Sequence, residues 1–137
     1  MRSYLVIGNV TLGSEPLAEH IRQCLARGDS RFHLVVPASH PADHAWSEGE
    51  AVAAARQRLE AALERFRQLG AEIDGEVGDS NPMLAVEDAM REGGFDEIIL
   101  STLPPGPSRW LKLDLPHRVA AKFAVPLTHV VGDAAEA

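Results

Sequence analysis

The sequence predicts an α/β fold: a doubly wound, five-stranded parallel sheet in the order 3-2-1-4-5, with helices on both faces. Short apolar runs alternate with amphipathic segments along the whole chain, and this alternation is typical of parallel sheets. The central runs are continuously apolar, as expected of strands that are covered on both faces. Right-handed crossovers then leave few possible strand orders.

The expected strands are short runs rich in apolar and β-branched residues, at 4–8, 32–36, 72–77, 96–100 and 127–131. The third run is different because its acidic residues alternate with apolar or small ones, which predicts a half-exposed edge strand protected from pairing. The fifth run, LTHVV, carries no charge at neutral pH. This difference between the two edges predicts a homodimer through the last strand, with Val130 as the position where a charge would break the pairing.

Four helices are expected between these strands. The clearest runs from Glu48 to Leu69 and has one apolar stripe. The first begins after Ser14 and ends at Gly28, and the third begins after Asn81 with proline at its first position. A last helix is expected over 115–123, after a long loop.

Composition sets broad limits on function. A chain of 137 residues fits one domain, residues 1–137. A net charge of −7 argues against nucleic-acid binding, which needs a broad basic surface. There is neither an apolar run long enough to span a membrane nor a signal-peptide core. The single cysteine, Cys24, cannot form an internal disulfide and is expected in the core; a cytoplasmic location is expected.

The strand order reverses between strands one and four, and open α/β sheets bind ligands in the crevice at the carboxyl ends of such strands. The loops that meet there supply the candidate ligand-binding residues. These are Gly8, Asn9, Val10, Thr11, Val36, Pro37, Ala38, Ser101, Thr102, Gly106, Arg109, Trp110, Leu113, Asp114, His117 and Arg118.

The loop from 104 to 118 is a basic segment of an acidic protein. Three cations (Arg109, Lys112 and Arg118) against Asp114 give it a net charge of +2. Arginine binds phosphate or carboxylate in a bidentate manner, and Trp110 could stack on a ring. The alternatives are that the cations face solvent or pair with Asp114, and that Trp110 only packs the loop.

Two other groupings are weaker. His40, Asp43 and His44 lie close together in a connection, but three donors without a fourth are a poor signal for a metal. Ser101 lacks the Gly-x-Ser-x-Gly setting of a nucleophile. We therefore expect no catalytic residues and no enzyme, with at most weak nucleotide hydrolysis as a distant alternative.

Three stretches resemble universal stress protein domains: GDSNPMLAVEDA at 78–89, FDEIIL at 95–100 and VAAKFAVPLTHVV at 119–131. The resemblance extends over nearly the whole chain and implies a Rossmann-like, five-stranded sheet. It also implies a homodimer through the last strand (Leu127, Thr128, His129, Val130 and Val131), and some members of the family bind ATP.

The sequence departs from the pattern of the ATP-binding members. They have an aspartate at the end of strand one, where this chain has Asn9, and a glycine-rich loop after strand four, where Gly106 is the only glycine. Leu113 and Asp114 replace the distal Gly-Ser. Glycines let backbone amides approach phosphate, whereas an aspartate at the helix N-cap would occupy those amides and repel phosphate. ATP binding in the usual family manner is therefore not expected.

Three functions stay open. The first is a non-enzymatic, universal stress protein-like role in binding a small ligand or in signalling; the ligand is not identified, with ATP or another anionic small molecule as candidates. In the second, a nucleotide binds through a variant anion site, with Asn9 and Thr11 as polar contacts, Val36 against a ring and Arg109 or Arg118 on the anion. In the third, Leu113, Trp110 and prolines close the pocket, and the domain acts through protein contacts.

Overall fold

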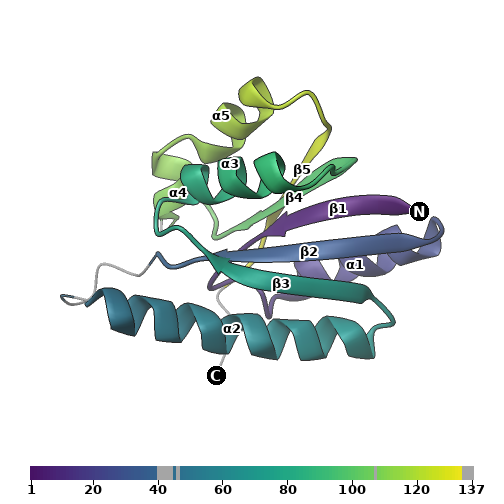
Figure 1. Cartoon of the computed structure of the whole chain (residues 1–137), viewed down its shortest axis with the longest axis horizontal. Helices are drawn as coiled ribbons and strands as arrows, with labels where there is room; N and C mark the ends of the chain where they lie inside the picture. Colours follow the sequence, from purple (N-terminus) through teal and green to yellow (C-terminus); the bar gives the residue numbers. More distant parts are fainter. Residues whose placement is uncertain (40–44, 46, 107, 134–137) are drawn as a thin grey trace.

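The chain folds into one parallel sheet with helices on both faces (Figure 1). The structure is a computed structural model that describes residues 1–39, 45, 47–106 and 108–133. The sheet has five strands in the order β3-β2-β1-β4-β5, and every neighbouring pair is parallel. The predicted fold class and strand order are confirmed. The elements are β1 (Arg2–Ile7), α1 (Glu15–Ala26), β2 (Ser30–Pro37), α2 (Glu48–Gln68), β3 (Glu72–Gly78), α3 (Pro82–Glu92), β4 (Glu97–Thr102), α4 (Arg109–Lys112), α5 (Leu115–Lys122) and β5 (Leu127–Val131).

The main difference from the expected elements lies in the loop after β4. Four residues of that loop form α4, where the sequence predicts no regular structure. Ser108 begins this helix, because its hydroxyl oxygen accepts a hydrogen bond of 3.1 Å from the amide of Leu111. So short a helix has too few residues to show a period, and its only local signal is the capping serine.

Two hydrophobic cores lie on opposite faces of the sheet. Helices α1 and α2 cover one face, and α3, α4 and α5 lie on the other (Figure 1). Side chains of β1 alternate between the two, so that Val6 packs toward α1 and α2 while Leu5 and Ile7 pack toward α3 and α5. This double burial explains why the central strands are continuously apolar. Cys24 is a core residue as expected, and burial raises the pKa of its thiol.

The structure also bears on two further expectations, which concern membrane-spanning segments and metal sites. Within the described residues, no helix is long and apolar enough to cross a membrane. The weak metal candidate formed by His40, Asp43 and His44 lies outside the described residues. Among the residues that are described, no group of three or more histidines, cysteines and acidic residues is arranged to hold a metal ion.

Strand β3 approaches α2 closely only because residue 75 is glycine. A Cβ at this position would lie 2.6 Å from the carbonyl oxygen of Leu34 and 2.7 Å from a methyl carbon of Leu59. The first of these atoms is backbone in the neighbouring strand, which cannot move away without disturbing the sheet. The close contact between β2, β3 and α2 therefore depends on Gly75.

We predict that Gly75→Ala lowers the free energy of unfolding by about 1–3 kcal/mol, because overpacking forces strand and helix apart. Urea denaturation with an unchanged m-value measures this. Gly49→Ala is the matched control: nothing lies within 4 Å of a Cβ there, and alanine favours the helix. Equal stability of Gly75→Ala and the wild type would contradict the assigned contact.

Candidate functional site

The crevice between β1 and β4, where the sequence places the site, is closed by side-chain hydrogen bonds. The hydroxyls of Thr11 and Ser101 lie 2.6 Å apart, and each residue is only 1% exposed. Thr102 is also buried, and its hydroxyl donates to the carbonyl oxygen of Leu103. A Cβ at Gly8 would meet the side chains of Leu12 and Ser101. The hydroxyls of these predicted ligand-binding residues are therefore bonded to other groups of the protein.

Asn9 connects three elements at this end of the sheet. Its Nδ2 donates to the carbonyl oxygens of Pro37 at 2.8 Å and Ser39 at 3.1 Å. Its Oδ1 accepts a hydrogen bond of 2.9 Å from Nη1 of Arg58, which lies on α2. The residue is 6% exposed. Asn9 thus fixes the end of β2 and the side chain of Arg58 relative to β1.

The segment 36–38 contributes no side chain to a ligand site. Val36 is fully buried in the core beneath α1 and α2, so the expectation that it lies against a ligand ring is wrong. Pro37 and Ala38 are also buried. Val10, in the loop after β1, is half-buried. The apolar run at the end of β2, residues 34–37, extends to the last residue of the strand, and this is why no side chain there is left for a ligand.

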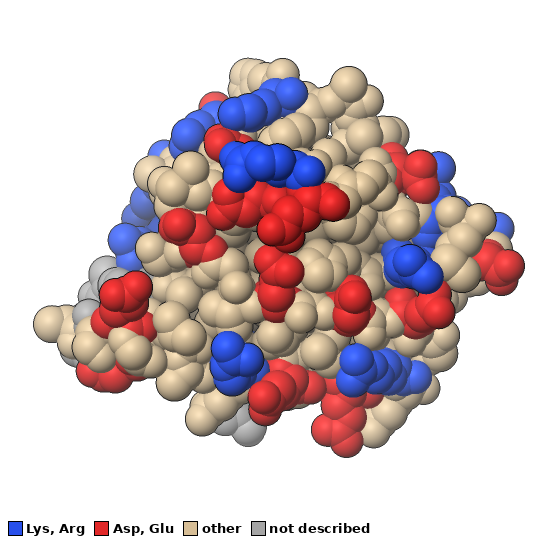
Figure 2. Space-filling view, in the orientation of Figure 1, with Lys and Arg blue, Asp and Glu red and all other residues tan. Residues whose placement is uncertain are grey.

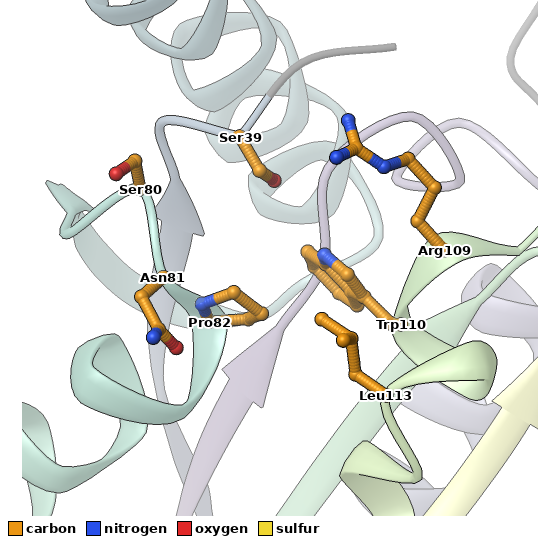
Figure 3. A pocket seen from close by; sticks show the side chains of 7 residues that line it. All are labelled: Ser39, Ser80, Asn81, Pro82, Arg109, Trp110 and Leu113. Carbon is orange, nitrogen blue, oxygen red and sulfur yellow. The ribbon is translucent and has the colours of Figure 1, made fainter. Parts of the chain in front are cut away.

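A pocket of about 290 Å³ lies beside this closed crevice, at the carboxyl ends of β2 and β3. Its walls come from the end of β2, the loop between β3 and α3, and α4 (Figure 3). The Trp110 ring projects into the middle of the pocket, across from Pro82 and beside Leu113 (Figure 3). The lining residues are Ser39, Ser80, Asn81, Pro82, Arg109, Trp110 and Leu113.

Two helix caps hold the walls of the pocket. Asn81 Oδ1 accepts hydrogen bonds from the amides of Met83 and Leu84, at 3.0 and 3.5 Å, and so begins α3. On the other wall, the buried Ser108 caps α4 and presents Trp110. Gly106, which is exposed and does not line the pocket, has a φ of 102° in the turn before α4. A side chain is disfavoured at that angle, so the glycine helps the chain to turn.

Asp114 does not cap α5 in the expected way. It occupies the N-cap position but has a left-handed φ of 56°, and its carboxylate makes no capping hydrogen bond. Instead, Oδ2 of Asp114 lies 3.5 Å from Nδ1 of His117. His117 and Arg118 are exposed on α5 and are not part of the pocket. The prediction that Asp114 occupies the helix amides is wrong because the left-handed backbone directs its side chain elsewhere.

The structure therefore brings together three of the candidate residues, Arg109, Trp110 and Leu113, in one pocket. The wall formed by Ser39, Ser80, Asn81 and Pro82 was not predicted as part of a site. Its signal is the rule already used for β1 and β4: polar residues directly after a strand lie at the carboxyl edge of a parallel sheet. Applied to β2 and β3, the same rule would have found these four residues.

Charges of both signs are interspersed over the face that carries α2, β3 and α3 (Figure 2). His33 on β2 lies 2.7 Å from Asp74 and 3.4 Å from Glu76 on β3. Arg31 and Glu72 form a further cross-strand pair at 3.5 Å. On this face, the acidic residues of β3 are thus paired with β2 and form part of a mixed surface, where no broad basic area lies.

No protein-family model matches the sequence, and no curated protein matches it either. Solved structures do match. A universal stress protein in complex with cAMP has a TM-score of 0.65 at 14% identity, over 96% of this chain and 98% of its own. A universal stress protein family protein from Arabidopsis thaliana with AMP bound has a TM-score of 0.67 at 10% identity, over 97% and 93%. A universal stress protein from Archaeoglobus fulgidus has a TM-score of 0.65 at 16% identity, over 95% and 93%. The chain therefore has the fold that the sequence resemblance implies.

The carboxyl ends of β4 and β5 are joined by a titratable contact. Oγ1 of Thr102 already donates to Leu103, so Nε2 of His129, 2.7 Å away, donates to it. His129 is an exposed residue, and partial desolvation by the surrounding protein lowers its pKa below the ordinary value of 6.5. Protonation is therefore more favourable in the unfolded chain than in the folded one.

We predict that this histidine makes the folded protein less stable as the pH decreases. Its effect is absent above about pH 6.5, and stability is lost as the pH decreases toward the lower pKa of the folded state. His129→Gln should reduce this loss, as measured by urea denaturation between pH 8 and pH 5. The difference between the two proteins at pH 8, where the histidine is neutral in both states, is the internal reference. An identical pH dependence of both proteins would contradict the prediction.

Proposed function

We propose that this protein is a non-enzymatic binding or signalling protein that takes a small, ring-containing ligand of the nucleoside or mononucleotide class in the Trp110 pocket. The observation that carries the proposal is the indole of Trp110 projecting into a pocket at the carboxyl edge of a parallel sheet. Such edges are the usual ligand sites of this architecture. Two proteins of the same fold have cAMP or AMP bound, which supports the choice of ligand class.

The chemistry of the walls suits a flat ring with polar groups. Trp110 and Pro82 offer apolar surfaces for stacking, and stacking of a base on an aromatic side chain contributes about 1–3 kcal/mol. The hydroxyl of Ser39 points toward Trp110 and provides a hydrogen-bonding group on the opposite wall (Figure 3). The guanidinium of Arg109 is part of the lining as well. This combination favours a heterocycle over a purely aliphatic ligand.

The volume and the closed crevice argue against a long polyphosphate. About 290 Å³ is at the lower end of the range for small-molecule sites. The route toward β1 and β4 is closed by Thr11 and Ser101. No glycine-rich loop brings backbone amides near that place, and Leu113 lies on the pocket wall. A mononucleotide fits these constraints better than ATP.

The absence of catalysis is part of the proposal. The hydroxyl of Ser101 is buried and bonded to that of Thr11, an arrangement that supplies no base to activate it. A cytoplasmic role in stress physiology is proposed on the single cysteine and the fold. The alternative of a closed protein-interaction module is not favoured: Trp110 packs partly against the core beneath α3 and α5, but a pocket of about 290 Å³ stays open beside Trp110 and Leu113.

We also propose a homodimer through β5. Within the described chain, β5 is an edge strand that pairs with β4 alone. Val131 is 41% exposed, whereas Val130 is 8% exposed and packs in the core with α1 and α2. A charge at Val130 would therefore disturb the fold, so the position chosen from the sequence is wrong for this purpose. Val131 is the position that tests the edge.

The first prediction concerns the ligand. Millimolar AMP or cAMP should raise the melting temperature, since a ligand at a hundred times its dissociation constant adds about 2.7 kcal/mol of stability. Mg·ATP should raise it less. Trp110→Ala should weaken AMP binding at least about fivefold through the lost stacking, as measured by calorimetry. Leu84→Ala is the control, because Leu84 is an exposed apolar residue outside the pocket lining.

No thermal shift with any of these nucleotides would overturn the proposed ligand class. Equal AMP affinity of Trp110→Ala and the wild type would show that nucleotides bind elsewhere on the protein.

The second prediction concerns assembly. Val131→Lys should yield monomers, because a lysine on an edge strand opposes strand pairing; sedimentation velocity measures the change. Leu84→Lys places the same charge on α3 and should leave the dimer intact. Wild-type monomers, or dimers of Val131→Lys, would refute an interface through β5.

A further inference from the structure

Arg58 differs in its partner from the arginines that pair with carboxylates. Several arginines pair with carboxylates, whereas Nη1 of Arg58 donates to the neutral amide oxygen of Asn9 at 2.9 Å. Among the described residues, no carboxylate pairs with it, although the side chain is half-buried. A partly buried cation without a counter-charge is costly and is relieved when an anion binds. The arginines with carboxylate partners are Arg2, Arg22, Arg31, Arg65 and Arg91.

Asn9 links this cation to the wall of the Trp110 pocket, although Arg58 is not one of the lining residues. Its Oδ1 holds Arg58, and its Nδ2 donates to the carbonyl oxygen of Ser39, whose residue lines the pocket. Arg58 is therefore one side chain away from the pocket wall. A guanidinium has five N–H donors, so the bond to Asn9 leaves most of them to other acceptors. Their planar, forked arrangement matches phosphate or carboxylate.

We propose that Arg58 is an anion-binding residue of the Trp110 pocket and that the ligand therefore carries a phosphate or carboxylate group. This inference rests on the proposed function and narrows it from nucleosides in general to nucleoside monophosphates and similar anions. Asn9 has a defined part in it: the neutral amide orients Arg58 without cancelling its charge. An aspartate at this position would form an ion pair with the arginine and compete with a bound anion.

The test uses AMP and adenosine, which share a ring and ribose and differ in the phosphate. Calorimetry on the full chain should show tighter binding of AMP than of adenosine. Arg58→Gln should weaken AMP binding about tenfold, since a hydrogen bond to a charged group is lost, and should change adenosine binding by less than about twofold. Arg58→Lys, which keeps the charge, should retain part of the preference for AMP.

Arg56→Gln is the matched control, because Arg56 is exposed on the same helix and its loss should leave both affinities unchanged. The ratio of the two affinities is the readout, because partial unfolding of a variant weakens both ligands equally. An unchanged ratio in Arg58→Gln overturns the role of Arg58 while the pocket and its ligand class stand. If neither AMP nor adenosine binds the wild type, the proposed function itself fails.

Discussion

The structure depends on one constraint, the burial of β1 on both faces at the centre of the sheet. Its side chains pack alternately into the two cores, so the strand has no charged residue between Tyr4 and Gly8. Polar chemistry is therefore confined to the loop that follows the strand. Asn9 and Thr11 are the first two polar side chains of that loop, and both are buried. A buried polar group must be hydrogen-bonded to be tolerated, and these residues meet that demand within the protein.

The way in which they meet it determines where a ligand can bind. Thr11 joins the ends of β1 and β4 through Ser101, and Asn9 joins β1 to β2 and α2. Together these contacts close the crevice that the strand order creates. The open space lies one strand further along, where Ser39 and the capped start of α3 face Trp110. The Trp110 pocket therefore lies beside β2 and β3 rather than between β1 and β4.

The sequence predicts the fold well because the relevant signals are local. The last strand has the predicted bounds, Leu127–Val131, since this short run, which has no acidic residue, lysine or arginine, lies between Pro126 and Gly132. The site is less predictable because it depends on the directions in which individual side chains point in the folded protein. Arg58 looks like any charge on an amphipathic helix until the tertiary structure brings it to Asn9. Asp114 has the residue type of a helix cap, but its left-handed backbone prevents that role.

The net charge of the protein explains why selection of the proposed ligand would depend on short-range contacts. With a net charge of −7, the protein as a whole repels anions, but at physiological ionic strength this repulsion fades within about 8 Å. The proposed anion would therefore be selected by the groups that it touches. An aspartate at the end of β1 would have neutralised Arg58, whereas the amide of Asn9 closes the crevice and leaves the cation its charge. The neutral Asn9 thus closes the crevice together with the Thr11–Ser101 contact, and it also underlies the proposed preference for an anion beside it.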